Sequence, residues 1–266
     1  MKDKIHNIDN SELAFYSTYN EELGLQFDCV IGNNITHKFP IHIHDSLCIG
    51  LINKGKRTII WTDKSEVINQ NEIFVINKNQ PHTINQIEPH DYTVITIKGK
   101  LDNIDVIFEN IVKSEACLIL FTQLLHEVKN NRTISLSEKW KKLHRYLIDN
   151  HKLSISLTVN ETFLRKSLEY IQNNYQQQIS VDDIAAHSCM SIYHFCRQFK
   201  LLTGLSPHNY LRQYRLNQSY KHLQNNTSVS DTAIETGFYD CSHFIKTFYS
   251  YMAVSPKEYQ ESVTQQ

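Results

Sequence analysis

A short stretch near residue 45 of this 266-residue chain carries several side chains that can bind a metal ion or a polar ligand. It reads FPIHIHDSLCIGLINKG, and on an extended strand alternate residues share one face. His42, His44 and Cys48 then lie on one face, and His82 follows a proline at the start of a later predicted strand. Imidazole and thiolate are ligands that zinc and related metals prefer. These four residues therefore define a candidate site.

Three interpretations of this site stay open: a metal ion, an organic or ionic effector that contacts the same groups, or no direct role. All depend on which face of the strand lies inside. If the face with Ile41 and Ile43 is buried instead, the histidines meet solvent and the site fails.

A second set of side chains occurs twice in the C-terminal part, with a fixed offset of 49 residues. His194-Phe195 corresponds to His243-Phe244, Phe199 to Phe248, Ser206-Pro207 to Ser255-Pro256, and Tyr210 to Tyr259. Upstream the offset slips by one residue, where a turn is expected. A repeat of this length indicates one supersecondary unit used twice.

The expected secondary structure changes from strands to helices near residue 100. Before it, β-branched and aromatic runs alternate with Asn, Gly and Lys turns, which predicts six to eight strands of a sandwich or small barrel. After it, two helices are expected to begin at Ser114 and Ser137, in SEACLILFTQLLHEVKN and SEKWKKLHRYLIDNH. The segment 155–160 separates them from the repeat region.

Each copy of the repeat reads as a short helix, a tight turn and a second helix, which is a helix-turn-helix. Ser180 and Asp183 form a capping-box pattern for a helix over 181–187. Ser191 is expected to cap the next helix, which Gly204 ends. Ser206-Pro207 starts a long helix that joins the copies, and the second copy begins at Ser230.

The second helix of each copy is predicted to be two-sided. Phe195, Phe199 and Leu202 are placed inward in the first copy, and Phe244 and Phe248 in the second. A single amphipathic helix with few charges is usually only a surface helix. Two of them, tied by one linker helix, could enter successive turns of a DNA groove on the order of 34 Å apart.

Composition sets limits on the class of protein. Hydrophobic residues make up 41% and charged residues 21%, as in a globular protein, and no apolar run is long enough for a membrane helix. Six scattered cysteines without a visible export signal predict free thiols and a cytoplasmic setting. The net charge is −1, and from residue 161 onward nine basic residues face nine acidic ones. DNA binding must therefore rest on where charges are placed.

The repeat region resembles the AraC/XylS family of bacterial transcription regulators over residues 161–262, through the YHF…F and SHF…F helices and the SP…Y close. The resemblance implies a regulator of transcription that binds an asymmetric double-stranded DNA site, with RNA polymerase as a further partner. It implies DNA contacts from both second helices. The residues concerned are Tyr193, His194, Cys196, Arg197, Lys200, Cys241, Ser242, His243, Lys246 and Tyr249. His194 is expected to be partly buried against phosphate or backbone, or purely structural.

The HxH…C…PH pattern resembles the cupin sensor domain common at the N-terminus of such regulators. Metal-binding cupins have Glu where this chain has Cys48. The expected fold is thus α+β and multidomain. It comprises a cupin-like barrel or jelly roll that senses an effector (1–100), a helical linker and dimerisation region (101–160), and an all-α domain with two helix-turn-helix motifs (161–262).

One departure from the family stands out: Cys189 occupies the first turn, where Gly is usual. A cysteine there must either accept a positive φ with strain or avoid it. The recognition helices also hold less Arg than is common in the family.

Two other functions are possible in principle. A cupin enzyme could hold a catalytic metal at His42, His44, Cys48 and His82, and a helical adaptor could bind protein partners. Neither requires a duplicated helix-turn-helix. We expect no enzyme activity, and a homodimer formed through residues 115–151, because ACLILFTQLL is too apolar to leave in water.

Overall fold

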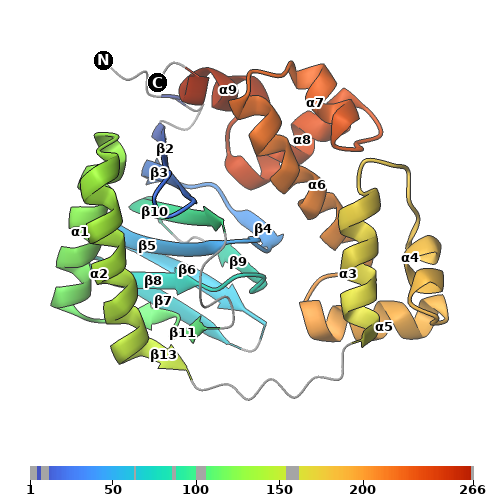
Figure 1. The fold of residues 1–266 in the computed structure, drawn as a ribbon, viewed down its shortest axis with the longest axis horizontal. Helices are drawn as coiled ribbons and strands as arrows, with labels where there is room; N and C mark the ends of the chain where they lie inside the picture. The colour runs from blue at the N-terminus through green and yellow to red at the C-terminus, as the bar shows by residue number, and fades with distance from the viewer. Residues whose placement is uncertain are drawn as a thin grey trace. The chain divides into compact units, whose positions relative to one another are not determined.

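A computed structural model describes residues 5–6, 12–62, 64–85, 88–99, 106–153 and 162–264. Its contacts divide the chain into two compact units (Figure 1). The first comprises the described residues up to Lys38 and from His44 to 153. The second comprises Phe39–Ile43 and the described residues between Leu157 and Thr264. The expected α+β class is confirmed, because strands dominate the first unit and helices the second. Residues 155–160, the expected separator, lie outside the described residues.

The first unit is built on an antiparallel sheet of seven strands, in the order β1-β2-β3-β10-β5-β8-β12. A second sheet places β6 between β9 and β7, and β11 pairs with β13. The described part of the first hundred residues thus holds more strands than the six to eight expected. The strands of this unit are Ile5–His6 (β1), Glu12–Asn20 (β2), Leu25–Ile35 (β3), Leu47–Lys54 (β5), Lys56–Trp61 (β6), Ser65–Asn69 (β7), Ile73–Ile76 (β8), His82–Asn85 (β9), His90–Gly99 (β10), Ile107–Phe108 (β11), Ile111–Val112 (β12) and Lys152–Leu153 (β13).

One face of the large sheet forms the core of this unit. Its cross-strand rows are apolar, for example Cys29, Ile95, Ile49 and Val75 on neighbouring strands. Helices α1 (Glu115–Lys129) and α2 (Thr133–His151) pack on this face and share its core (Figure 1). The helical region therefore belongs to the same unit as the strands, although the sequence changes character at residue 100.

The apolar run in α1 packs into the core of the first unit. Cys117, Phe121 and Leu124 are fully buried against the sheet, so most of the run is covered without a partner chain. Ser114 caps α1 as expected, accepting a bond from the backbone N of Cys117. The expected cap at Ser137 is wrong: α2 begins one turn earlier, because Leu136 is needed in the core. The homodimer stays a prediction.

The stretch 39–55 is not one strand, contrary to expectation. β4 (Phe39–His42) ends before a bend at Asp45 and Ser46, and β5 begins at Leu47. The carbonyl of His44 accepts a hydrogen bond from the loop residue Asn79 at 2.7 Å. Every residue from Leu47 to Ile52 is buried, so β5 is covered on both faces.

The second unit contains α3 (Thr162–Asn174), α4 (Val181–His187), α5 (Ile192–Thr203), α6 (Pro207–Gln224), α7 (Val229–Glu235), α8 (Cys241–Met252) and α9 (Pro256–Thr264), together with β4. Helix α6 joins the two helix-turn-helix halves (Figure 1). The capping box of Ser180 with Asp183 is confirmed, as is the start of α6 at Ser206-Pro207. The predicted start at Ser230 is wrong, because Ser228 caps α7.

The turns of the two halves have the same backbone geometry. Cys189 has φ +56° and its counterpart Gly237 has φ +79°. The N–H of Cys189 bonds to Ala186 at 2.9 Å, and that of Gly237 bonds to Ile234 at 3.0 Å. The next residue in each turn bonds to the alanine one position earlier in its helix, at 3.0 and 2.9 Å. The turn thus imposes a left-handed conformation on Cys189, which only glycine adopts without cost.

Candidate functional sites

Helices α5 and α8 each bury one face and expose the other. Phe195, Phe199, Phe244 and Phe248 are fully buried, which confirms the expected inward faces. The opposite faces carry exposed side chains at helical spacing. These are Tyr193, His194, Arg197 and Lys200 on α5, and Ser242, His243, Lys246 and Tyr249 on α8. Cys196 and Cys241 are half-buried at the edges of these faces.

Two expectations for α5 need correction. Leu202 is 36% exposed, because the neighbouring Thr203 takes the inward position and donates its hydroxyl to the carbonyls of Phe199 and Leu205. His194 is exposed, not partly buried. Its imidazole is therefore available at the surface beside Tyr193.

Sequence reasoning missed Tyr239, whose side chain is 84% exposed. It lies between Phe238, the counterpart of Met190, and Asp240, which caps α8 by accepting a bond from the N–H of His243 at 2.7 Å. Tyr239 is thus the additional residue that changes the offset between the two copies from 48 to 49 residues. The slip itself was the signal that could have pointed to it.

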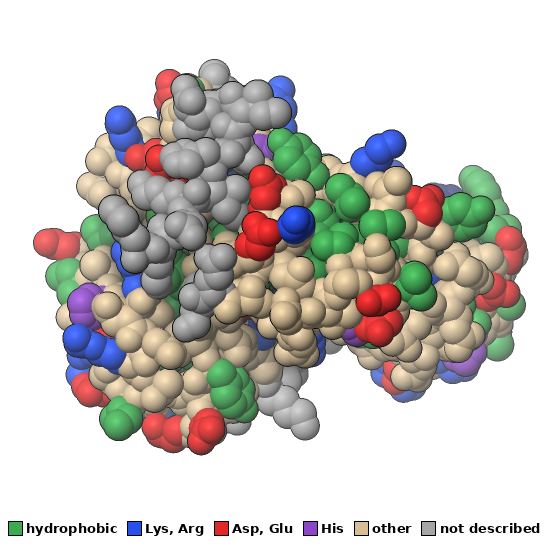
Figure 2. All heavy atoms as spheres, turned by 90° about the horizontal axis from the view of Figure 1, so that it is seen from above, with side chains coloured by type: hydrophobic (Ala, Val, Ile, Leu, Met, Phe, Trp, Pro, Cys, Tyr) green, Lys and Arg blue, Asp and Glu red, His purple; other side chains and the backbone are tan. Residues whose placement is uncertain are grey.

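On the face drawn in Figure 2, acidic and basic side chains are interspersed, in keeping with the net charge of −1. Arg215 serves a structural purpose, since it donates to the carbonyls of Tyr175 and Gln177 at 2.8 and 2.6 Å. Arg197, Lys200 and Lys246 instead lie on the exposed faces of α5 and α8. Among the described residues, no helix has the length and apolar character needed to cross a membrane.

The face of the large sheet turned away from α1 and α2 carries a polar row. Pairing brings Ser17, Asp28, Thr96 and Cys48 side by side on four neighbouring strands. Lys98 and Gln26 form the adjacent row. The odd-numbered residues of β5 face the helices, so the even-numbered face of Cys48 and Gly50 is the inner one.

Asp28 and Lys98 form a half-buried ion pair at 2.7 Å on this inner face. Burial alone raises the pKa of the Asp28 carboxyl, but the Lys98 charge and hydrogen bonds from Lys98, Ser17 and Gln26 together lower it below its usual value. Asp28 is therefore a carboxylate. Sequence reasoning missed this pair, although the alternation of Thr96 and Lys98 with isoleucines in β10 is a signal for it.

His44 and His82 lie close together in the first unit. Their ring centroids are 5.2 Å apart, and their ligand nitrogen atoms lie within 4.8 Å of each other. Burial, and to a lesser degree the charge of Lys98, lowers the pKa of His44 to about 4. His44 is therefore neutral at pH 7, the form of imidazole that can donate a lone pair.

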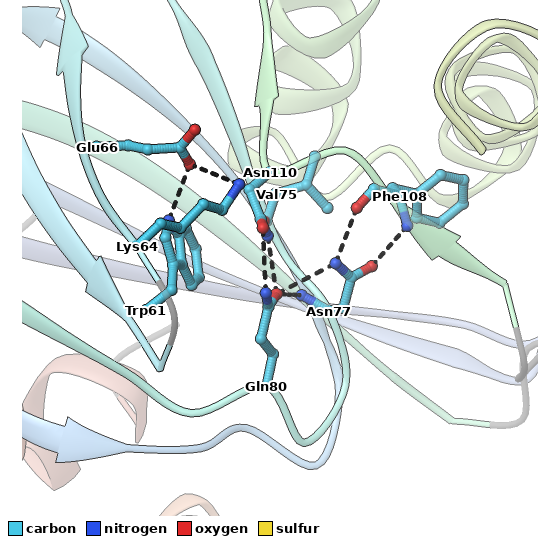
Figure 3. A network of polar contacts seen from close by, with 8 residues as sticks. All are labelled: Trp61, Lys64, Glu66, Val75, Asn77, Gln80, Phe108 and Asn110. Atoms are coloured by element: carbon cyan, nitrogen blue, oxygen red, sulfur yellow. Dashed lines mark hydrogen bonds and ion pairs between the residues drawn. The ribbon is translucent and has the colours of Figure 1, made fainter. Parts of the chain in front are cut away.

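A hydrogen-bond network around Gln80 (Figure 3) holds the loop that precedes His82. His82 Nδ1 lies 3.0 Å from the carbonyl of Gln80. A carbonyl can only accept, so Nδ1 carries the proton and Nε2 is the lone-pair nitrogen. The Gln80 amide is fixed by Asn77 at 3.1 Å and by Asn110 at 2.8 and 3.1 Å. Trp61, bonded to Glu66 at 3.0 Å, places its ring 5.8 Å from that of His82.

Cys48 and His42, the two remaining predicted ligands, each have a polar partner of their own. Cys48 Sγ is 3.5 Å from Thr96 Oγ1, and burial raises the pKa of its thiol to about 12. It does not join His44 and His82 as a third ligand atom within 4.8 Å among the described residues. His42 lies on β4 and belongs by its contacts to the second unit, with Nδ1 2.7 Å from the carbonyl of Pro40.

Models of known protein families match parts of both units. Residues 24–149 match the model of the AraC-like ligand binding domain, and residues 184–262 match a helix-turn-helix domain. The HTH-type transcriptional activator AarP of Providencia stuartii is 33% identical over 120 residues, which are 43% of this chain and 89% of that protein. An uncharacterised HTH-type regulator of Bacillus subtilis, YbfI, is 28% identical over 228 residues, 79% of this chain and 82% of its own length.

Among solved structures, ToxT from Vibrio cholerae O395 has a similar fold. The TM-score is 0.57 at 17% identity, and the match covers 96% of this chain and 98% of that one. ToxT with a bound unsaturated fatty acid matches with a TM-score of 0.55 at 17% identity, over 100% and 99% of the two chains.

Proposed function

The chain belongs to the AraC family of DNA-binding transcriptional regulators, and from that premise we propose which residues read DNA and which meet the effector. The exposed faces of α5 and α8 enter successive stretches of the major groove. The observation that carries this assignment is the matched pair of turns, since Cys189 and Gly237 present two equivalent helices from one unit.

Arg197 and Lys246 are assigned to base edges, because each lies in the middle of its exposed helix face. The other residues on α5 and α8 that were predicted to contact DNA are proposed to do so as well. Tyr239 is added to them, because an aromatic side chain that is 84% exposed beside the start of α8 can stack on sugar or contact a thymine methyl group.

The test of this assignment compares specific with random DNA. Arg197→Ala or Lys246→Ala should cost about 1–3 kcal/mol of specific binding if the residue reads a base. Lys257→Ala, on the exposed side of α9, is the matched control. An equal loss on both DNAs would assign the residue to phosphate instead.

The effector is assigned to the inner face of the first unit. Thr96, Lys98, His44 and His82 offer a hydroxyl, an ammonium and two imidazoles, which suits a small organic molecule with polar or anionic groups. The solved ToxT structure with a bound fatty acid is compatible with a ligand of this kind. His42 and Cys48 stay predictions as further contacts.

A metal ion held by His44 and His82 is the second candidate for this site. The His82 imidazole, oriented by the backbone carbonyl of Gln80, is held in the way that metal-binding histidines are held. A cupin enzyme would need such a metal, whereas the relatives of this chain are transcriptional regulators. Metal analysis of protein purified without a His tag, with His82→Ala as control, separates the two occupants.

Ligand binding itself is measured by thermal unfolding of the full chain against a panel of small molecules, since a ligand that binds only the folded state stabilises it. Thr96→Val should reduce the shift, because it removes a hydroxyl from the inner face while keeping its volume. Thr122→Val on α1 is the matched control. Equal shifts in both variants would place the effector elsewhere.

RNA polymerase and a second copy of the chain are the further partners that we assign. The exposed Ile119 of α1, at 51%, is where a dimer contact would form. Ile119→Asp should then yield a monomer in sedimentation, whereas Val67→Asp on β7 should not. A monomeric wild-type chain at micromolar concentration would contradict the dimer.

A further inference from the structure

Gln213 on α6 binds the backbone of β4 in the way that a neighbouring strand would. Its Nε2 donates to the carbonyl of Ile41 at 2.7 Å, and its Oε1 accepts from the N–H of Ile43 at 2.7 Å. One carboxamide thus satisfies both polar groups on the same edge of the strand. The side chain is 2% exposed, so these bonds are shielded from water.

The segment Phe39–Ile43 contacts both helix-turn-helix halves. Ile43 is 5% exposed and lies in the apolar core that contains Phe195 and Phe199 of α5. The His42 ring lies 6.0 Å from the ring of Tyr251 on α8. Gln213 Nε2 also donates to the Tyr251 hydroxyl at 3.1 Å. One buried amide therefore links β4 to the helix that carries Lys246.

The same segment is joined by peptide bonds to the first unit at both ends. Lys38 and His44 belong to that unit, and His44 pairs with His82. A ligand that shifts the backbone at His44 also shifts Ile43, whose N–H is held by Gln213. The strand is therefore a short mechanical connection between the effector-binding residues and the two recognition helices.

We propose that Gln213 is the positioning residue through which the state of the effector site reaches α5 and α8. This inference rests on the proposed function, because it assumes that the exposed helix faces bind DNA. Coupling between two sites is reciprocal. If the effector alters DNA binding through this segment, DNA must in turn alter the residues around His44 and His82.

Reciprocity allows a test without knowledge of the effector. Hydrogen exchange is measured by mass spectrometry on the full chain, with and without a DNA site selected from a random pool. DNA should slow exchange in α5 and α8, and it should also change exchange in peptides that cover His44–Leu47 and His82–Asn85. If DNA protects α5 and α8 but leaves exchange in the His44–Leu47 and His82–Asn85 peptides unchanged, the coupling is contradicted although the protein still binds DNA.

Two substitutions then test the amide itself. Gln213→Glu keeps the shape but replaces the donor to Ile41 with a second acceptor, and Gln213→Met removes both bonds at similar volume. In either variant, exchange of the 39–43 peptide should be faster without DNA. The response of the barrel peptides to DNA should be lost while protection of α5 and α8 persists.

Gln218→Glu, half-buried on the same helix, is the matched control and should keep the wild-type response. A barrel response that persists in both Gln213 variants would overturn the proposal. Absence of any protection of α5 and α8 in the wild type would instead contradict the proposed function.

Discussion

At the scale of single residues, Cys189 and Gly237 occupy equivalent turns of the two halves, and the left-handed backbone there strains the cysteine but not the glycine. A left-handed φ costs a residue with a side chain about 1–2 kcal/mol, and glycine loses part of that advantage through its freedom in the unfolded chain. Cys189 is exposed, so its replacement removes little packing. Cys189→Gly should therefore raise the free energy of unfolding by up to about 1 kcal/mol.

The reverse change at the counterpart gives the control. A Cβ on Gly237 would lie 2.3 Å from the carbonyl oxygen of Tyr175 and 3.0 Å from Arg215 Nε, so Gly237→Ala should destabilise by about 1–3 kcal/mol. Chemical denaturation of both variants checks the pair. Destabilisation by Cys189→Gly would show that the thiol contributes more than the turn costs.

His90 predicts a pH dependence of stability. Burial, reinforced by the charge of Arg57, lowers the pKa of His90 to about 4 from 6.5. As pH falls below 6.5 the unfolded chain gains this proton first, so stability is lost between pH 6.5 and 4 and levels off below. His90→Phe retains the stacking on Tyr92 and should flatten this slope. His208→Phe, at an exposed position, is the matched control, and an unchanged slope in His90→Phe would refute the assignment.

At the scale of elements, the Asn77–Gln80–Asn110 network fixes the loop before β9 (Figure 3). Asn110→Ala removes the side-chain donor to the Val75 carbonyl and the acceptor for Gln80 Nε2. We expect a loss of about 1–3 kcal/mol in the free energy of unfolding. Asn150→Ala, which removes an exposed side-chain bond within α2, is the control. Equal losses in the free energy of unfolding from the two substitutions would show that the buried network contributes no more to stability than one exposed hydrogen bond.

Elements with local signals were predictable from the sequence. The capping box at Ser180, the proline start of α6 and the buried phenylalanines of the repeat depend on neighbours within a few residues, and the structure confirms them. The single strand over 39–55 was wrong, because its break is fixed by the distant Asn79. The starts at Ser137 and Ser230 failed because a serine inside a helix has the same local signature as a cap.

At the scale of the whole molecule, the site was predictable only in part. His44 and His82 came together as the resemblance to cupin sensor domains implied, whereas Asp28 and Lys98 come from strands that the alternation of residues alone cannot pair. Phe39–Ile43 belongs by its contacts to the second unit, in which Gln213, 170 residues beyond Ile43, bonds to it. No local pattern contains that information.

The measurement that most directly tests the central claim is selection of DNA from a random pool by the full chain, followed by footprinting of the recovered site. The account predicts one asymmetric motif with two protected stretches about one helical turn, roughly 34 Å, apart. Arg197→Ala should weaken protection of one stretch and Lys246→Ala that of the other. Recovery of DNA without a shared motif, or of a single stretch lost equally in both variants, would contradict the reading of DNA by α5 and α8.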